Sequence, residues 1–153
     1  MISVRWPAVV ADLPWLRLGV AICYDIRFPQ LFRAHAHADA TALTAPAAFT
    51  RQTGEAHWHV LQRARAIENG AFVISAAQAG RHADGRETFG HSIIVGPWGE
   101  VLAEAGGDGP EVIVAEIDPA RALEARRKVP ALKNERSFAL PEMAEPTAMR
   151  SAS

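Results

Sequence analysis

The sequence predicts an α/β domain built on a mixed sheet with helices on one face. The first half of the chain alternates short apolar runs with segments of helical periodicity, whereas the second half joins apolar runs through glycine- and proline-containing turns. The 153 residues, 49% of them hydrophobic, suffice for one core. Such a layer leaves one sheet face bare, so we expect a partner surface to cover it.

The first half is expected to contain a hairpin, a helix, a strand and a longer helix, over residues 8–13 with 16–22, 28–38, 40–45 and 53–69. Pro29 suits the first turn of the shorter helix because its φ is fixed, and Gly70 suits the end of the longer one. The apolar face of the longer helix is expected to comprise Ala56, Val60, Leu61, Ala64 and Ile67.

The second half is expected to contain a buried strand, a polar turn, a hairpin, a further strand and a basic helix, over residues 71–77, 80–85, 91–95 with 101–105, 112–117 and 119–129. Gly96 to Gly99 form the turn of the hairpin. The chain is polar and alanine-rich from Pro141 onward. We therefore expect one domain over residues 1–140 and a disordered tail over residues 141–153.

Composition excludes several classes of protein. The 16 basic and 17 acidic side chains nearly balance, and the four tryptophans are scattered, so a nucleic-acid partner is not expected. The sequence contains no apolar run long enough to span a membrane and no secretory signal near Met1. The single cysteine excludes an internal disulfide and suits a cytoplasmic location.

Cys23, that single cysteine, stands where an apolar run ends and a helix is about to begin. This placement would hold its thiol between a rigid strand and the positive end of a helix, where the thiolate is favoured. The alternative is a small buried hydrophobe, but Tyr24, Asp25 and Arg27 surround the thiol with polar groups. We therefore interpret Cys23 as a nucleophile.

Several neighbours of Cys23 in the expected fold are candidate binding residues. The planar guanidinium of Arg27 suits a substrate carboxylate, although an ion pair with Asp25 is an equal alternative. Gln78 ends a strand and could reach a pocket, and Phe49 and Thr53 follow the strand that Pro46 stops.

Six segments of the chain, taken together and in order, resemble the nitrilase superfamily of carbon-nitrogen hydrolases, and within it the amidase branch. They are residues 19–29, 56–58, 63–69, 76–78, 90–92 and 97–99, and the resemblance runs from about residue 8 to residue 138. It implies an α-β-β-α sandwich, usually paired into dimers, that hydrolyses linear amides with a glutamate, a lysine and a cysteine and without a cofactor.

The resemblance assigns roles to three residues around the thiol. Cys23 matches the nucleophile, and the backbone N–H of Tyr24 matches one donor to the oxyanion. Arg27 matches a position that binds a substrate carboxylate in some relatives. The small-molecule amide and a homo-oligomer are the partners that the resemblance implies.

The chain departs from this family in one respect. The family places its catalytic glutamate and lysine upstream of the cysteine, but the 22 residues before Cys23 contain neither. The chain has two lysines, Lys128 and Lys133, both near its C-terminal end. It therefore looks like the C-terminal half of such an enzyme.

Histidines provide an alternative to the missing base, as part of a Cys/His pair. His35 lies seven residues past Phe28, so we expect it to pack on the apolar side of the helix, whereas His37 faces another side and is expected to be solvated. Both lie well along a helix that leads away from the thiol, which favours these structural positions over catalysis. For His57, lining of the site and packing of the helix both stay open. His59 points away from His57, and His91 is expected to form a local hydrogen bond.

Glu68 is a second alternative base, but its position beside Arg65 favours an ion pair or a helix cap. No His-x-x-x-His or Cys-x-x-Cys spacing occurs, so the sequence predicts no metal site.

Two functions remain from the sequence. The first is hydrolysis of a small linear amide that bears a carboxylate, through a thioester on Cys23 with release of ammonia. The second is a catalytically incompetent half-domain that acts only by association.

Overall fold

The computed structural model describes residues 7–139, and within them six strands form one sheet in the order β1-β2-β3-β4-β7-β8. Strands β2, β3 and β4 run parallel, and β1, β7 and β8 are antiparallel to their neighbours. The elements are β1 (Val9–Asp12), β2 (Arg17–Val20), η1 (Cys23–Arg27), α1 (Pro29–His37), β3 (Ala42–Thr44), α2 (Arg51–Asn69), β4 (Phe72–Ser75), β5 (Ala79–Arg81), β6 (Glu87–Phe89), β7 (Ile93–Val95), β8 (Val101–Glu104) and α3 (Pro119–Lys128).

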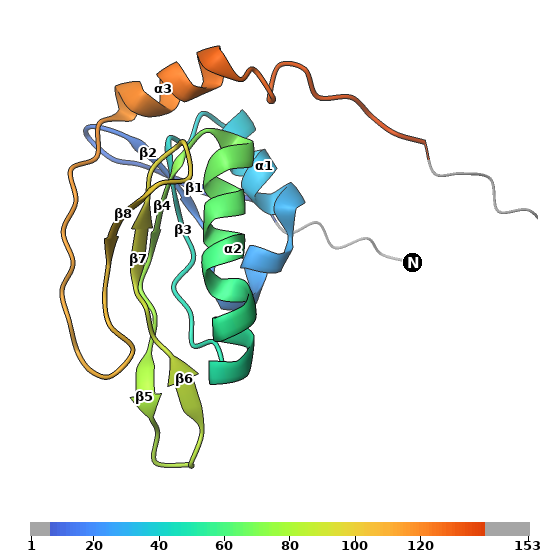
Figure 1. Cartoon of the computed structure of the whole chain (residues 1–153). Helices are drawn as coiled ribbons and strands as arrows, with labels where there is room; N and C mark the ends of the chain where they lie inside the picture. The colour runs from blue at the N-terminus through green and yellow to red at the C-terminus, as the bar shows by residue number, and fades with distance from the viewer. Residues whose placement is uncertain (1–6, 140–153) are drawn as a thin grey trace, which may run out of the picture.

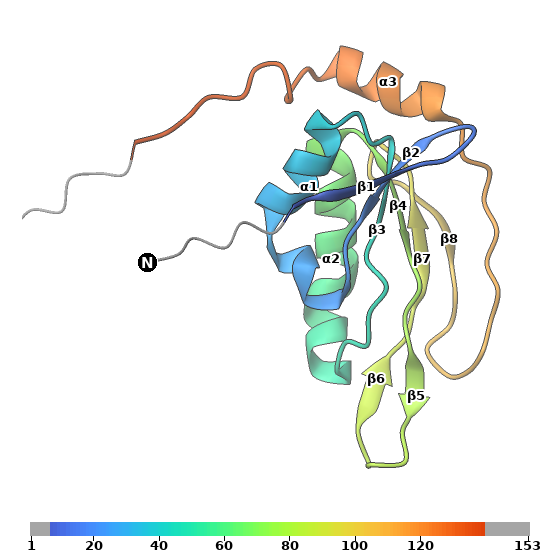
Figure 2. The same ribbon diagram turned by 180° about the vertical axis from the view of Figure 1, so that it is seen from behind.

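Helices α1 and α2 cover one face of the sheet, and α3 crosses the edge at which β3 and β4 begin (Figure 1). Arg126 of α3 fixes this crossing, because its guanidinium donates hydrogen bonds to the carbonyl oxygens of Ala40 and Asn69, at 2.5 and 3.0 Å. Figure 2 shows the same arrangement from behind. The predicted mixed sheet with helices on one face is confirmed.

The main core lies between the sheet and the two helices. Leu43, Val73 and Ile93 on neighbouring strands pack with Phe32 of α1 and Trp58 of α2, and all five are fully buried. Because successive side chains of a strand point to opposite faces, Ala42 and Phe72 face the other way. There they form a smaller cluster with Ala122 of α3.

The apolar face predicted for the long helix is wrong at Ala56, Val60 and Ile67, which are exposed, whereas Leu61 packs against the core as predicted. Val60 and Ile67 are 67% and 54% exposed, whereas Gln62, Arg65 and Asn69 are buried. Each of these buried polar side chains forms at least one hydrogen bond, such as that from Ser75 Oγ to Gln62 Oε1 at 2.9 Å, although Gln62 Nε2 and Asn69 Oδ1 have no partner within the described residues. Gly70 ends the helix in the left-handed conformation, with φ of 53°, as predicted.

Two predictions for the second half are corrected. Residues 112–117 form no strand in the described part of the chain, because this extended segment runs beside β8 without pairing with it (Figures 1 and 2). The predicted polar turn over residues 80–85 belongs to a small hairpin, in which β5 pairs with β6 and the turn follows β5.

The predicted tail over residues 141–153 lies outside the described residues, as does the start of the predicted domain. Among the helices of residues 7–139, none combines the length and the apolar character that a membrane crossing requires.

Candidate active site

Cys23 lies at the carboxyl end of β2, is partly exposed, and has a backbone φ of 48°. A residue other than glycine in this left-handed region costs about 1–3 kcal/mol, and such residues cluster at active sites; Asp39 and His91 adopt it here as well. Cys23 opens the short turn η1, and α1 begins only at Pro29, so the thiol does not lie directly at the start of α1 as the sequence suggested. It lies instead on a separate turn between strand and helix.

Three parallel strands end at the same edge of the sheet as Cys23. The N–H of Cys23 donates a hydrogen bond to the carbonyl of Pro46, 2.8 Å away, just beyond β3. Ala47 in turn donates to Ala76, and Gln78 donates to Ala47, both at 2.9 Å. Because neighbouring strands lie about 4.8 Å apart, Cys23 and Gln78 lie roughly 10 Å apart along this edge of the sheet. The exposed side chain of Gln78 therefore belongs to the same edge as the thiol.

The turn that carries Cys23 is fixed by two polar side chains. Asp25 accepts a hydrogen bond from the N–H of Ile22 at 2.8 Å and so closes the start of η1. Arg65 of α2 donates to the carbonyl oxygen of Ile26 from Nε and Nη2, at 2.9 and 2.6 Å. The N–H of Tyr24 has no acceptor within residues 7–139, so it is free to bind an oxyanion.

Arg27 points to a polar corner next to this turn. Both terminal nitrogens of its guanidinium lie 3.4 Å from Nδ1 of His57, and the guanidinium lies over the rings of Phe49 and Tyr24, 5.2 and 5.6 Å from their centroids. Within the described residues it forms no ion pair, with Asp25 or any other carboxylate. The predicted alternative of an Arg27–Asp25 pair is therefore wrong, and the cation can bind an added carboxylate.

Phe49 and Thr53 differ in what they offer this site. Phe49 is 7% exposed and packs edge-on against Trp58 with 5.2 Å between ring centroids, so it forms a fixed wall behind Arg27. Thr53 helps to cap α2: its N–H donates to Oγ1 of Thr50 at 3.4 Å, and the two hydroxyl groups lie 2.9 Å apart. A substrate-binding role for Thr53 stays a prediction.

The residues considered as alternative bases form no hydrogen bond with the thiol of Cys23 in the described part of the chain. Glu68 accepts a hydrogen bond from Arg65 at 2.9 Å, so the predicted ion pair is confirmed. His35 is fully buried, as expected. The Sγ atom of Cys23 forms no hydrogen bond with a histidine in the described part of the chain. Of the histidines, His57 comes into the polar corner through its contact with Arg27.

The two lysines lie away from Cys23. Lys128 is the last residue of α3 and pairs with Glu124 at 2.7 Å, and Lys133 follows that helix. Because α3 crosses the edge where β3 and β4 begin, it lies at the opposite end of the sheet from Cys23, which is at the carboxyl ends of the strands (Figure 1). Neither lysine takes part in the site.

Sequence reasoning did not identify the role of Arg65, for which it favours a solvated or structural position over substrate binding. Its two hydrogen bonds to Ile26 join α2 to the turn that carries Cys23 across 39 residues of sequence. A basic residue on a helix gives no sequence signal of such a long-range contact. The buried surroundings of Arg65 became evident only in the folded chain.

Comparison with known proteins gives consistent results. The family model described as "Carbon-nitrogen hydrolase" matches residues 5–127. A deaminated glutathione amidase of Synechocystis sp. is 45% identical over 134 residues, which cover 88% of this chain and 49% of that protein. The chain thus spans about half the length of this curated relative.

Two solved structures show the same likeness. The Nit3 protein of Saccharomyces cerevisiae, a member of branch 10 of the nitrilase superfamily, has a TM-score of 0.77 and 40% identity, over 84% of this chain and 47% of that one. A mutant amidase from Nesterenkonia sp. AN1 has a TM-score of 0.67 and 31% identity, over 83% and 47%. Its structure shows covalent addition of the acetamide moiety of fluoroacetamide at the active site cysteine. The extent of the family match and these likenesses lead to one conclusion: the chain belongs to the carbon-nitrogen hydrolase family.

Proposed function

We propose that Cys23 is the nucleophile of an amidase that hydrolyses a small linear amide bearing a carboxylate. The observation that carries this proposal is the position of Cys23, which is partly exposed and has a left-handed backbone at the carboxyl edge of the sheet. The free N–H of Tyr24 and the cation of Arg27, which has no carboxylate partner within the described residues, belong to the same turn. The names of the relatives, which are amidases, support an amide as the substrate.

In the proposed reaction, the thiolate sulfur of Cys23 attacks the amide carbonyl carbon, forming a C–S bond while the carbonyl π electrons move to oxygen. The N–H of Tyr24 stabilises this oxyanion. The C–N bond then breaks, and the nitrogen takes a proton from solvent water and leaves as ammonia. Water attacks the thioester, the C–S bond breaks, and the carboxylic acid is released. Arg27 holds the carboxylate of the substrate throughout.

A labelling experiment tests the role of the thiol. Incubation of the chain with fluoroacetamide is expected to add one acetamide moiety, as the sulfur forms a C–S bond and fluoride leaves. Intact-protein mass spectrometry should show this adduct on the wild-type chain and none on Cys23→Ala. Because Cys23 is the only cysteine, the variant is an unambiguous control. A rate no greater than that of the same chain in denaturant would count against an activated nucleophile.

A second candidate function is association without catalysis. The observation that favours it is the location of both lysines at the end of the sheet remote from Cys23, together with the lack of glutamate or lysine before it. Ammonia release from simple amides, measured on the 153-residue chain, separates the two functions. Turnover that is lost in Cys23→Ala supports the amidase, whereas labelling without turnover supports the half-domain.

Two further expectations from the sequence stay proposals. A cytoplasmic location is consistent with the single cysteine, which forms no disulfide within the chain. A homo-oligomer is supported by the exposed apolar side chains of Val60 and Ile67 on the outer face of α2.

A further inference from the structure

Three side chains with metal-binding atoms meet between α2 and the sheet. They are His59 of α2, His91 just before β7, and Glu104 at the end of β8. Nε2 of His59 and Nδ1 of His91 lie 2.8 and 2.7 Å from the same atom, Oε1 of Glu104. We infer that this His59–His91–Glu104 cluster binds one Zn²⁺ ion or a similar divalent transition-metal ion.

The ligand set and its spacing fit this class of metal. Two imidazole nitrogens and one carboxylate oxygen form a known zinc ligand set that leaves a fourth position for water, whereas Mg²⁺ and Ca²⁺ prefer oxygen alone. Tetrahedral bonds of about 2.0–2.2 Å place neighbouring ligand atoms roughly 3.3 Å apart. The three ligand atoms already lie within 4.8 Å of one another. Admission of an ion thus requires each nitrogen to move from Oε1 by about half an ångström.

The two imidazole rings are held in place by their surroundings. The ring of Phe89 stacks on His91 with 4.2 Å between centroids and lies edge-on to His59 at 5.8 Å. The chain also passes close to His91, because a Cβ atom at Gly107 would lie 3.1 Å from its Nε2. Rings that are already oriented lose less freedom when an ion binds. The cluster is therefore largely preorganised.

The cluster is accessible, and its carboxylate is ionised. The three side chains are 29–34% exposed, so an ion and a coordinated water can reach them. Burial by itself raises the pKa of Glu104, but the hydrogen bonds from His59 and His91 hold the pKa below its ordinary value. Because these hydrogen bonds use the same nitrogens that would bind the ion, each ring must give up its proton at that nitrogen when the ion binds.

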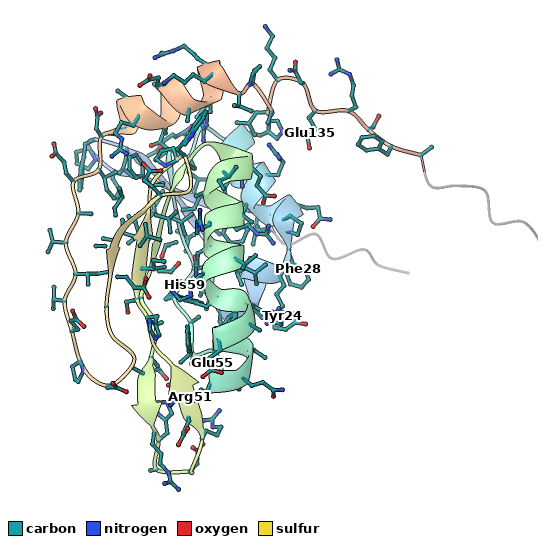
Figure 3. All side chains as sticks on the ribbon, viewed as in Figure 1. Tyr24, Phe28, Arg51, Glu55, His59 and Glu135 are labelled. Carbon is teal, nitrogen blue, oxygen red and sulfur yellow. The ribbon has the colours of Figure 1, made fainter. Side chains whose placement is uncertain are left out.

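The bound ion would join elements that are distant in sequence. It would connect α2 to the two strands β7 and β8, on the side of α2 that faces the sheet. Tyr24 and Phe28 lie on the other side of α2 from His59 in the view of Figure 3. His57 contacts Arg27, so the metal cluster and the polar corner use different faces of one helix. The ion would therefore stabilise the fold without contact with the thiol.

Metal titration tests this inference directly. The 153-residue chain carrying Cys23→Ala, which removes the competing thiol, is freed of metal with EDTA and titrated with ZnCl₂ by calorimetry. We expect one ion per chain, and an affinity at least about 10-fold weaker when His59→Ala or Glu104→Gln is added. The matched control is His37→Ala, because His37 pairs with a single carboxylate, Glu135, without a second histidine. That variant should bind Zn²⁺ as the parent does.

Three outcomes would overturn the site. These are no stoichiometric binding by the parent, the same affinity in both cluster variants, or loss of binding in His37→Ala. If a cluster variant does not fold, NMR of the parent shows instead which histidines bind the ion. Addition of Zn²⁺ should shift the ring signals of His59 and His91 and leave those of His57 unchanged. Shifts confined to His37 or His57 would contradict the assignment.

Discussion

At the residue scale, Arg27 is the feature that gives the proposed site its preference for a charged substrate. Its guanidinium lies over the rings of Phe49 and Tyr24, and its polar contact within the described residues is with Nδ1 of His57. A cation that lacks a carboxylate partner binds an added one through charge-assisted hydrogen bonds. Selectivity between charged and neutral reagents therefore reports on Arg27 separately from the reactivity of the thiol.

Replacement of Arg27 by alanine is expected to change which reagent modifies Cys23. The rate with iodoacetate relative to iodoacetamide should fall roughly 10-fold or more, because a hydrogen bond to a charged group contributes about 1.5–3 kcal/mol. The two rates can be followed by intact-protein mass spectrometry. Arg81→Ala, at an exposed arginine of β5, is the matched control and should keep the parent ratio. An unchanged ratio in Arg27→Ala would remove the carboxylate-binding role.

His35 is the second residue with a distinct physical consequence. It is fully buried, and neither ring nitrogen has a hydrogen-bond partner in the described structure. Burial lowers the pKa of His35, and the charge of Asp25 opposes this effect in part. The unfolded chain therefore binds a proton at this ring at a higher pH than the folded chain does.

Acidification is expected to weaken the fold through His35. Below about pH 6.5 the unfolded ring is protonated first, so the free energy of unfolding should fall by up to about 1.4 kcal/mol per pH unit until the folded pKa is reached. Urea unfolding between pH 5 and pH 8 measures this slope. In His35→Leu the slope over this range should be smaller, because no titrating ring remains. Equal slopes in the two proteins would show that other groups control the acid sensitivity.

At the element scale, α2 supports the turn that carries Cys23 through Arg65. Its guanidinium donates two hydrogen bonds to the carbonyl of Ile26 and lies 5.5 Å from the ring centroid of Phe32. Loss of these donors would leave a buried carbonyl and the carboxylate of Glu68 without their partner. The helix thus contributes to the site without approaching the thiol.

Arg65→Met tests this support. It retains much of the apolar stem but removes the donors, so we expect the free energy of unfolding to fall by about 1–3 kcal/mol. Labelling of Cys23 by fluoroacetamide should also slow in the folded chain, because η1 is held less firmly. Arg63→Met, which removes a single hydrogen bond to Gly99 on the far side from η1, should leave the labelling rate unchanged. Equal effects of both variants on labelling would indicate a general loss of stability.

The elements also show what the sequence could and could not predict. Local signals were sufficient for α1, α2 and α3, because Pro29, Gly70 and Pro119 mark their ends. The buried face of α2 was not predictable by apolar periodicity, since Gln62 and Arg65 are buried through partners far away in sequence. Periodicity also cannot supply a partner strand, so the alternating residues 112–117 remained unpaired.

The site was predictable to a similar degree. The position of Cys23 after an apolar strand placed it at the sheet edge, and the parallel order of β2, β3 and β4 brought Gln78 to that edge. The His59–His91–Glu104 cluster could not be foreseen, because its members come from three elements and form no local motif. Spacing rules detect metal sites only where the ligands are close in sequence.

At the scale of the whole molecule, apolar side chains remain on two surfaces. Val60 and Ile67 are exposed on the outer face of α2, and Val112 and Val114 are 88% and 83% exposed on the segment beside β8. The second pair alternates with half-buried residues, as in a strand that covers a sheet. Exposed apolar patches of this kind mark surfaces for association.

We therefore expect the chain to associate in solution. Light scattering after gel filtration should give a mass above the 16.5 kDa of one chain. Val60→Lys combined with Ile67→Lys should reduce this mass if α2 forms the contact, and Val112→Lys combined with Val114→Lys should do so if the segment beside β8 forms it. A monomer whose strand amides are fully protected from hydrogen exchange would contradict both versions.

The left-handed backbone at Cys23 has a consequence for rate as well as for structure. In the proposed reaction, the main chain orients the sulfur before the amide binds, so orientation requires no further loss of freedom. A sequence change remote from the thiol that let this residue relax to an ordinary φ could thus suppress turnover while the protein gained thermal resistance. In the proposed enzyme, the backbone conformation of this one residue would therefore raise the reactivity of the thiol and lower thermal stability.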